Sequence, residues 1–393
     1  MIASETTRSR PSGRRLLAIL ALAATLPAAG CGDDESSGDG GQAASGGGDA
    51  SGIVAEAQEM LESAKQPLEF KAPGPAIDAA KLEGKTVAIV SVDQRVPILA
   101  IANRSLEEAA KEAGIRVTLA DAKSQVTRMQ QGIQAAARNA DALILTGIPI
   151  AAVPAALEQA KDVPSVSVLN NQPKEGAPGQ GAGELVYASS APDYERGGAL
   201  VAAQAVVDTE GELVAEIFDT KEITPSPDVV RGMKSVLDKC STCEVTENTT
   251  PLAEWATALT PKAQSTIRRN PKLNYLLPIF DDMGIFLSAG IRQAGAADRV
   301  KVAALDGTPA ALKLIQEDDV FTANPGQPTG WLGWHALDQA MRGMLDEEPG
   351  DPVIPTRLLD DSNLEGVDVD DIDAPYGDVK YREGFRELWG LGG

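Results

Sequence analysis

Residues 86–92 read TVAIVSV, an uninterrupted apolar run typical of a parallel β-strand that is covered on both faces. Residues 98–113 follow with the apolar spacing of a helix, and Gly114 stands where a helix C-cap is expected. This alternation of strand and helix continues to residue 207 and is repeated from residue 213 onward. The pattern predicts an α/β protein of two doubly wound, Rossmann-like lobes, with a crevice between them.

The expected elements can be written as two parallel series. Strands are predicted at 86–92, 115–120, 142–145, 165–169 and 185–188, then at 213–218, 243–249, 275–277, 300–305 and near 321. Helices are predicted at 53–66, 98–113, 126–138, 151–161 and 194–207, then at 229–239, 255–270, 283–294, 309–316, 330–344 and 381–388. NADALIL at 139–145 has its counterpart in NPKLNYLL at 270–277, at the same place in the second half.

Composition excludes several classes of function. The 393 residues carry a net charge of −22, with 35 basic and 57 acidic side chains, which argues against a nucleic-acid binder. A single histidine, His335, makes a Ser-His-Asp or Cys-His enzyme an unfavourable reading and excludes a multi-histidine zinc site. No phosphate-binding loop of the form GxxxxGK[ST] occurs, so the chain is not an ATPase subunit of that type. We therefore expect no cofactor, no metal and no enzymatic activity.

The N-terminus reads as an export signal. Four arginines among residues 8–15 precede the apolar run 16–26, which is too short to span a bilayer. The run ends in LPAAGC, and small residues before Cys31 resemble the lipobox of bacterial lipoproteins, which implies cleavage before Cys31 and lipid attachment to it. Residues 32–51 are rich in glycine and acidic residues and have no large apolar side chain, as expected of a flexible tether. The predicted location is outside the cytoplasm, on a membrane lipid anchor.

Polar residues follow the predicted strands at the edge where α/β sheets bind ligands. These candidates for ligand binding are Asp93, Gln94, Asn170, Asn171, Ser190, Arg231, Trp255, Asp281, Asp306 and Gln327. Carboxylates, amides and a guanidinium can bind hydroxyl groups, and an indole can cover the apolar face of a sugar ring. An aspartate at a helix start is also a common N-cap, but Thr308 can cap the helix after Asp306 and so leaves that carboxylate for a ligand. The set favours a neutral, polyhydroxylated ligand.

Several of these segments carry a family resemblance. LADAKSQVTRMQQGIQAAARNADALILTG at 119–147, VRGM at 230–233, FDDM at 280–283, ALDGT at 304–308 and GQP at 326–328 resemble the type I periplasmic sugar-binding proteins of the ribose-binding group. The resemblance implies a periplasmic binding protein type I fold and the receptor role of an ABC importer. It implies that Arg231, Asp281 and Asp306 are polar ligand contacts and that Trp255 stacks on a ring.

The sequence departs from that group at two cleft positions. Ile98 and Leu99 follow Pro97 where the group often has aromatic residues, and Asn170-Asn171 stand where it often has Asp-Arg. These are positions that define which sugar fits.

The resemblance also implies a domain layout with a three-strand hinge. We expect a signal peptide at 1–30, a tether at 31–52, and a helix and connector at 53–83. The first lobe is expected to comprise 84–191 and 329–351, and the second 192–328 and 352–393. Crossings between lobes are predicted near 191, 305–307 and 326–329. The protein is expected to act as a monomer with an ABC permease as its partner.

Two further motifs are interpreted as structural. Cys240 and Cys243 lie after a predicted helix, where the helix dipole disfavours a thiolate, so a disulfide is preferred over a redox site. The acidic run 360–373 lacks the ligand spacing of an EF-hand and is interpreted as a solvated loop.

Three alternatives remain at this point: a binding protein for a non-sugar solute such as an amino acid or signalling molecule, a secreted glycosidase using Asp281 and Asp306, and a sugar-responsive transcription regulator. The export signal and the lack of a basic helix-turn-helix argue against the regulator.

Overall fold

The computed structural model describes residues 50–170, 185–317 and 320–392. Cys31 and Asn171, predicted as lipid-attachment and ligand-binding residues, lie outside the described residues. None of the helices in the described part of the chain has both the length and the apolar character that crossing a membrane requires.

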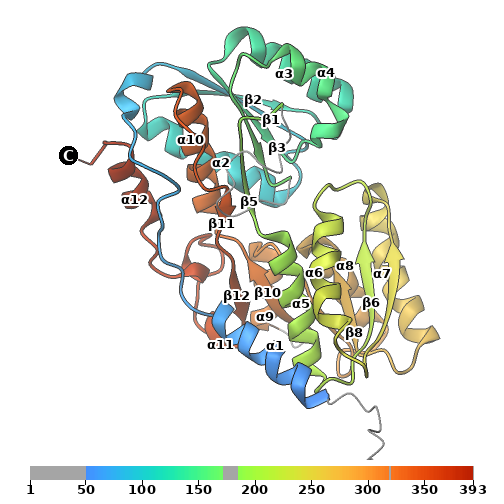
Figure 1. Cartoon of the computed structure of the whole chain (residues 1–393). Helices are drawn as coiled ribbons and strands as arrows, with labels where there is room; N and C mark the ends of the chain where they lie inside the picture. Colours follow the sequence, from blue (N-terminus) through green and yellow to red (C-terminus); the bar gives the residue numbers. More distant parts are fainter. Residues whose placement is uncertain (1–49, 171–184, 318–319, 393) are drawn as a thin grey trace, which may run out of the picture. The chain divides into compact units, whose positions relative to one another are not determined.

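The first lobe is built on a sheet with the strand order β11-β5-β4-β3-β1-β2, all parallel (Figure 1). Its strands are β1 (Thr86–Ser91), β2 (Arg116–Asp121), β3 (Ala142–Thr146), β4 (Ser165–Val168), β5 (Ala188–Pro192) and β11 (Val353–Ile354). Its helices are α2 (Pro97–Glu112), α3 (Val126–Asn139), η2 (Ile150–Ala152), α4 (Pro154–Gln159) and α10 (Thr329–Met344).

Strand β1 explains why the opening apolar run has no polar alternation. Val87 and Ile89 belong to the core that includes α2 and α10, whereas Ala88 and Val90 belong to the core beneath α3 and α4. Successive side chains of a strand point to opposite faces, so burial on both faces requires apolar residues at every position.

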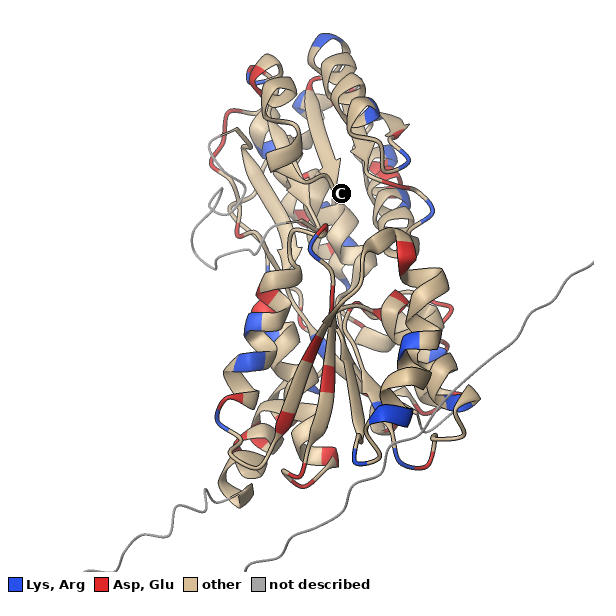
Figure 2. Cartoon of the chain, turned by 90° about the vertical axis from the view of Figure 1, so that its right-hand side faces the viewer, with Lys and Arg blue, Asp and Glu red and all other residues tan. Residues whose placement is uncertain are grey.

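The second lobe repeats the arrangement with the order β12-β10-β9-β8-β6-β7. Its strands are β6 (Val214–Asp219), β7 (Glu244–Thr249), β8 (Tyr275–Pro278), β9 (Lys301–Ala303), β10 (Phe321–Gly326) and β12 (Arg357–Asp360), the last of which is antiparallel. Its helices are α5 (Tyr194–Asp208), α6 (Ser226–Leu237), η3 (Leu252–Glu254), α7 (Trp255–Arg269), α8 (Asp281–Gln293), α9 (Pro309–Glu317) and α11 (Asp361–Leu364). Acidic and basic residues are interspersed along the helices, as Figure 2 shows.

Two glycines allow helices α5 and α6 to touch. A Cβ atom on Gly198 would lie 2.0 Å from the Val229 carbonyl oxygen, and one on Gly232 would lie 1.9 Å from that of Glu195. No side chain fits at either position, so the backbones meet directly at this crossing.

The terminal segments join the two lobes. Helix α1 (Ala50–Ala64) packs on α5 of the second lobe, and the chain then reaches η1 (Ala79–Leu82) beside α10. After η4 (Ala374–Tyr376), helix α12 (Tyr381–Leu388) packs on α10, and the side chains of Phe385 and Trp389 are fully buried.

Three links run between the sheets at the hinge. They are the β5–α5 junction, the β10–α10 junction and the β11–β12 turn between Ile354 and Arg357. Residues 305–307, predicted as a crossing between lobes, do not cross: they lie between β9 and α9, both in the second lobe. Residues 352–393 were expected in the second lobe, but β11 extends the first sheet and α12 packs against α10. The physical reason is that β11 pairs with β5, and that Trp389 stacks on Trp334 with ring centroids 5.2 Å apart.

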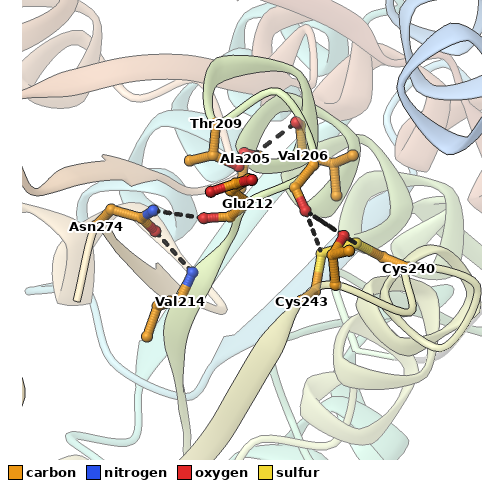
Figure 3. Close-up of a disulfide and its surroundings, with 10 residues drawn as sticks. Ala205, Val206, Thr209, Glu212, Val214, Cys240, Cys243 and Asn274 are labelled. Atoms are coloured by element: carbon orange, nitrogen blue, oxygen red, sulfur yellow. Dashed lines mark hydrogen bonds between the residues drawn. A yellow bond between two sulfur atoms is a disulfide. The ribbon is translucent and has the colours of Figure 1, made fainter. Parts of the chain in front are cut away.

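Cys240 and Cys243 are joined by a disulfide at the end of α6 (Figure 3). The bond closes the short turn that leads into β7, and Thr242 Oγ1 donates to the Gly211 carbonyl 2.6 Å away. Nearby, Asn274 accepts from the Val214 N–H and donates to the Glu212 carbonyl, each at 2.8 Å (Figure 3). The cysteines therefore lie among turn contacts at the far end of β6 from the carboxyl edge of the sheet.

Candidate functional site

A cavity of about 180 Å³ lies between the carboxyl ends of the two sheets. Its walls come from loops that follow β1, β3 and β4 in the first lobe and β6, β7, β8 and β9 in the second. Parallel strands place their following loops at one edge, so residues separated by two hundred positions meet here. The polar lining residues are Asn170, Glu222, Thr224, Asp282, Asp306 and Thr308.

A carboxylate pair underlies the second-lobe wall. Asp306 lines the cavity and accepts a hydrogen bond from Gln327 Nε2 at 3.1 Å. Asp281 is fully buried behind it and accepts from the Thr308 N–H at 2.8 Å, from Thr308 Oγ1 at 2.7 Å and from Asn324 Nδ2. Asp281 therefore fixes the turn that presents Asp306, and Gln327 supports Asp306 from the hinge.

The surroundings favour protonation of these carboxyl groups. Burial raises the pKa of Asp281 to about 7, and burial alone raises the pKa of Asp282. For Asp306, burial and then the negative charge of Asp281 raise the pKa well above its usual value. In such surroundings the ionised form of the carboxyl group is destabilised. A ligand that forms hydrogen bonds with the group can therefore shift its protonation equilibrium.

Trp255 contributes an aromatic wall at the start of α7. Its side chain lines the cavity, is 7% exposed, and donates from Nε1 to the Thr250 carbonyl at 3.2 Å. The hydrogen bond fixes the plane of the ring, so the indole is held in place before any ligand binds. The same burial means that truncation of this side chain would also destabilise the fold.

The first-lobe wall is apolar. Val92, Val96, Ile98 and Leu99, around the start of α2, line the cavity together with Leu169 after β4. Asn170, which is 2% exposed, is the polar side chain that this lobe supplies among the described lining residues. The predicted pair Ile98 and Leu99 therefore lies at the cavity, as its position after Pro97 suggested.

Other predicted residues of the first lobe lie outside the cavity lining. Asp93 accepts from the Arg95 side chain at 2.9 and 2.6 Å and from Ser124 Oγ at 2.8 Å, and these partners lower its pKa, Arg95 most strongly. The Gln94 N–H donates to Asp121 Oδ1 at 3.2 Å. Asp93 therefore closes its own loop and does not line the cavity.

Ser190 lies in the core of the hinge. Its Oγ is 2.8 Å from His335 Nδ1, and His335 Nε2 is 2.8 Å from the Asp351 carbonyl. A carbonyl only accepts, so Nε2 carries the proton and Nδ1 accepts from the serine. Burial lowers the pKa of His335, which keeps the ring neutral in this arrangement.

Arg231 lies on the exposed side of α6. Its guanidinium pairs with Glu195 and Asp228, and the side chain is 56% exposed. Its place in a family-like motif predicted a ligand contact, but its position on the helix directs it to acidic neighbours on α5 and α6. Of the predicted set, Asn170, Trp255 and Asp306 line the cavity, and Asp281 and Gln327 support it from behind.

Apart from Ile98 and Leu99, the apolar lining residues were not predicted, and neither was Glu222. The apolar ones were missed because valine and leucine next to a strand are indistinguishable by pattern from core residues. Glu222 lies in the loop after β6, where its carboxylate accepts from Thr220 Oγ1. The loop 220–225 follows a predicted strand, and that position at the carboxyl edge of the sheet is the sequence signal that identifies Glu222.

The charged side chains among the described lining residues are all acidic. Among the described residues, no lysine or arginine lines the cavity, and no group of acidic, cysteine or histidine side chains is arranged to hold a metal ion. The arrangement can therefore accept hydrogen bonds from hydroxyl or amine groups but offers an anion no charged partner.

Comparison with known proteins gives one family and a set of similar folds. The family model described as "Periplasmic binding protein domain" matches residues 87–347. Among curated proteins, the sequence has no significant match.

Similar solved structures include three solute-binding proteins of ABC transporters. One from Agrobacterium vitis with bound allitol has a TM-score of 0.65 and 16% identity, over 72% of this chain and 98% of that one. One from Bacillus halodurans with bound myo-inositol has a TM-score of 0.64 and 18% identity, over 72% and 96%. The 5-methylthioribose transporter protein from Thermotoga lettingae has a TM-score of 0.66 and 16% identity, over 78% and 98%. At these identities the likeness establishes the fold.

Proposed function

Because the chain belongs to the periplasmic binding protein family, we propose that it is the extracytoplasmic solute-binding protein of an ABC importer, with a sugar or polyol as its ligand. The observation that carries the proposal is the cavity between the carboxyl ends of two sheets, with the rigid indole of Trp255 and the carboxylates of Asp282 and Asp306 in its walls. Structural relatives carry allitol, myo-inositol and 5-methylthioribose, all of which present several hydroxyl groups.

The mechanism proposed is closure around the ligand. A solute that contacts Asn170 on one lobe and Asp306 on the other binds the closed form more tightly and shifts the population toward it. The hinge links at the β5–α5 and β10–α10 junctions would absorb the rotation. The permease would then recognise the closed form, and the protein would act as a monomer.

We also propose that the chain is exported and anchored by lipid. Residues 1–30 would be the signal peptide, Cys31 the lipidated residue and 31–52 the tether. The two lobes defined by the sheets would then form the receptor. Mass spectrometry of the mature protein tests this proposal, since an acylated N-terminal Cys31 is the expected species and a chain beginning at Met1 would contradict it.

The alternatives fit the site less well. An amino acid needs a partner for its α-carboxylate, and no arginine or lysine lines the cavity among the described residues. A retaining or inverting glycosidase needs two accessible carboxyl groups. Asp281 is fully buried and accepts hydrogen bonds from Thr308 and Asn324, so it is not available to attack a sugar.

Isothermal titration calorimetry tests the proposed function. Pentoses, hexoses, inositols and linear polyols would be titrated into the protein alongside amino acids. Saturable binding of a sugar or polyol, with no product detected after long incubation, is the expected result. Binding restricted to amino acids, or release of a hydrolysis product from a glycoside, would contradict the proposal.

A further inference from the structure

We propose that the ligand is amphipathic and carries no negative charge: its hydroxylated end contacts the second lobe, and an apolar substituent contacts the first. This inference rests on the proposed function and narrows its substrate class. The observations behind it are the apolar character of one wall, the pairing of the carboxylate nearest to that wall, and the charge of the opposite wall.

The apolar wall is continuous across the first lobe. Val92 and Val96 come from the segment between β1 and α2, Leu99 comes from the first turn of α2, and Leu169 follows β4. A polyol placed against this surface would lose water from its hydroxyl groups without gaining acceptors, which is unfavourable. An alkyl or thioalkyl substituent there would gain affinity of about fourfold for each buried methylene.

The carboxylate of the same segment, Asp93, is already paired. Asp93 holds the Arg95 guanidinium through two side-chain hydrogen bonds and accepts a third from Ser124. Rotating Asp93 into the cavity would break all of these at once. The carboxylate nearest to the apolar wall therefore closes the loop that carries Val96 and does not line the cavity.

Apolar side chains of the second lobe continue the same surface toward solvent. Ile223, Pro225 and Leu252 line the cavity beside Trp255, and Leu252 is 38% exposed. Few large apolar side chains in the described part of the chain are this exposed. An apolar substituent on the ligand would cover this surface in the closed form.

The opposite wall selects against anions. Glu222, Asp282 and Asp306 line it, Asp281 lies directly behind Asp306, and no basic side chain lines the cavity among the described residues. Ionised carboxyl groups without a counter-ion are costly when buried. A carboxylate or phosphate on the ligand would find no cation in the described lining and would oppose the ionisation of these groups further. Hydroxyl donors would instead lower that cost by hydrogen bonding.

The test compares matched ligands by calorimetry on the whole chain. Ribose, glucose and galactose would be titrated beside derivatives carrying a methyl or propyl group at the anomeric oxygen or as a thioether on the terminal carbon. Glucuronic and galacturonic acids would serve as the anionic counterparts. We expect one propyl derivative to bind at least tenfold more tightly than its parent sugar, and each uronic acid to bind at least tenfold more weakly than the neutral sugar.

A pair of conservative variants locates the effect. Val96→Thr places a hydroxyl group in the apolar wall and should reduce the propyl-to-parent ratio about fivefold. Val126→Thr makes the same change at a side chain that is 44% exposed and does not line the cavity, and should leave the ratio unchanged.

The outcomes separate the inference from the proposed function. Tight binding of free sugars with weaker binding of every alkyl derivative would overturn the inference and leave the sugar receptor intact. Uronic acids that bind as well as neutral sugars would overturn the part that concerns charge. If no sugar, polyol or derivative bound saturably, the proposed function itself would fail.

Discussion

Replacing Asp306 with asparagine separates the binding role of the cavity from its contribution to stability. The side chain lines the cavity, is 8% exposed and accepts from Gln327 Nε2, and asparagine can keep that hydrogen bond through its own carbonyl oxygen. The backbone at position 306 has φ of 141°, outside the left-handed helical region at about +57°, and asparagine meets the same backbone constraint as the aspartate that it replaces. The substitution therefore removes the ionisable group and keeps the size and shape of the side chain.

Asp306→Asn should weaken sugar binding but increase the stability of the ligand-free protein relative to the native chain at high pH. A hydrogen bond to a charged group contributes about 1.5–3 kcal/mol, so loss of the carboxylate should weaken sugar binding by roughly 10- to 150-fold. In the free protein, Asp306 has a raised pKa because of burial and the charge of Asp281. Its neutral form stabilises the fold fully below the unfolded-state pKa of about 4, and this contribution is lost as pH rises through the folded-state pKa.

The variant should therefore become more stable than the native chain as pH increases. The difference should grow by about 1.4 kcal/mol for each pH unit between the unfolded-state and folded-state pKa values. Urea denaturation without ligand from pH 4 to pH 8 measures it, and calorimetry at pH 8 measures binding. If Asp306→Asn lost stability at pH 8 while its sugar affinity stayed within threefold of the native value, the assignment of Asp306 to the cavity would be refuted.

Three further substitutions test the fold. Gly333→Ala would place a Cβ atom 2.5 Å from the backbone of α2 and should lower the free energy of unfolding by about 3 kcal/mol, whereas Gly52→Ala, whose Cβ would have no atom within 4 Å, should not lower it. Urea denaturation compares the two variants, and equal stability would contradict the α2–α10 packing. Replacing Cys240 and Cys243 by serine removes the disulfide that closes a very short loop and should lower the free energy of unfolding by about 2 kcal/mol. Ligand affinity should stay unchanged, and a loss of binding would contradict this prediction. Arg342→Met leaves the buried Asp338 carboxylate, 2.7 Å from the guanidinium, without its counter-ion, although Asp338 still accepts from Trp389 Nε1. The substitution should lower the free energy of unfolding by about 3–5 kcal/mol, and a neutral outcome in thermal denaturation would show that the pair is dispensable.

Strong periodicity made most elements predictable, and the exceptions have local causes. The strand expected at 185–188 lies at Ala188–Pro192, because its position is set by pairing with β4, where Val166 lies opposite Ala188. The helix expected at 151–161 is split into η2 and α4 because Pro154 begins a new helical turn. Neither pairing partner nor helix break is visible in apolar spacing alone.

The site was predicted only where chemistry and topology agreed. Trp255 was recognisable as an indole at the start of a helix, and Asp306 as a carboxylate that Thr308 frees from capping the next helix. Asp93 also follows a strand, but its carboxylate pairs with Arg95 two residues away and does not line the cavity. The closeness of the two residues in the sequence is a signal for that ion pair. The valines and leucines of the first-lobe wall carried no such signal, since the same residue types fill the core on both faces of β1.

The path of the N-terminal segment decides which lobe an upstream anchor would hold. Helix α1 packs on α5, and Lys65, which follows it, pairs with Asp360 of β12 at 2.9 Å. The chain crosses to the first lobe only after this, where Phe70 packs on Trp331 with ring centroids 5.4 Å apart. The chain is therefore attached to the second lobe before it reaches the first, and hinge closure would move the apolar wall of the first lobe relative to α1.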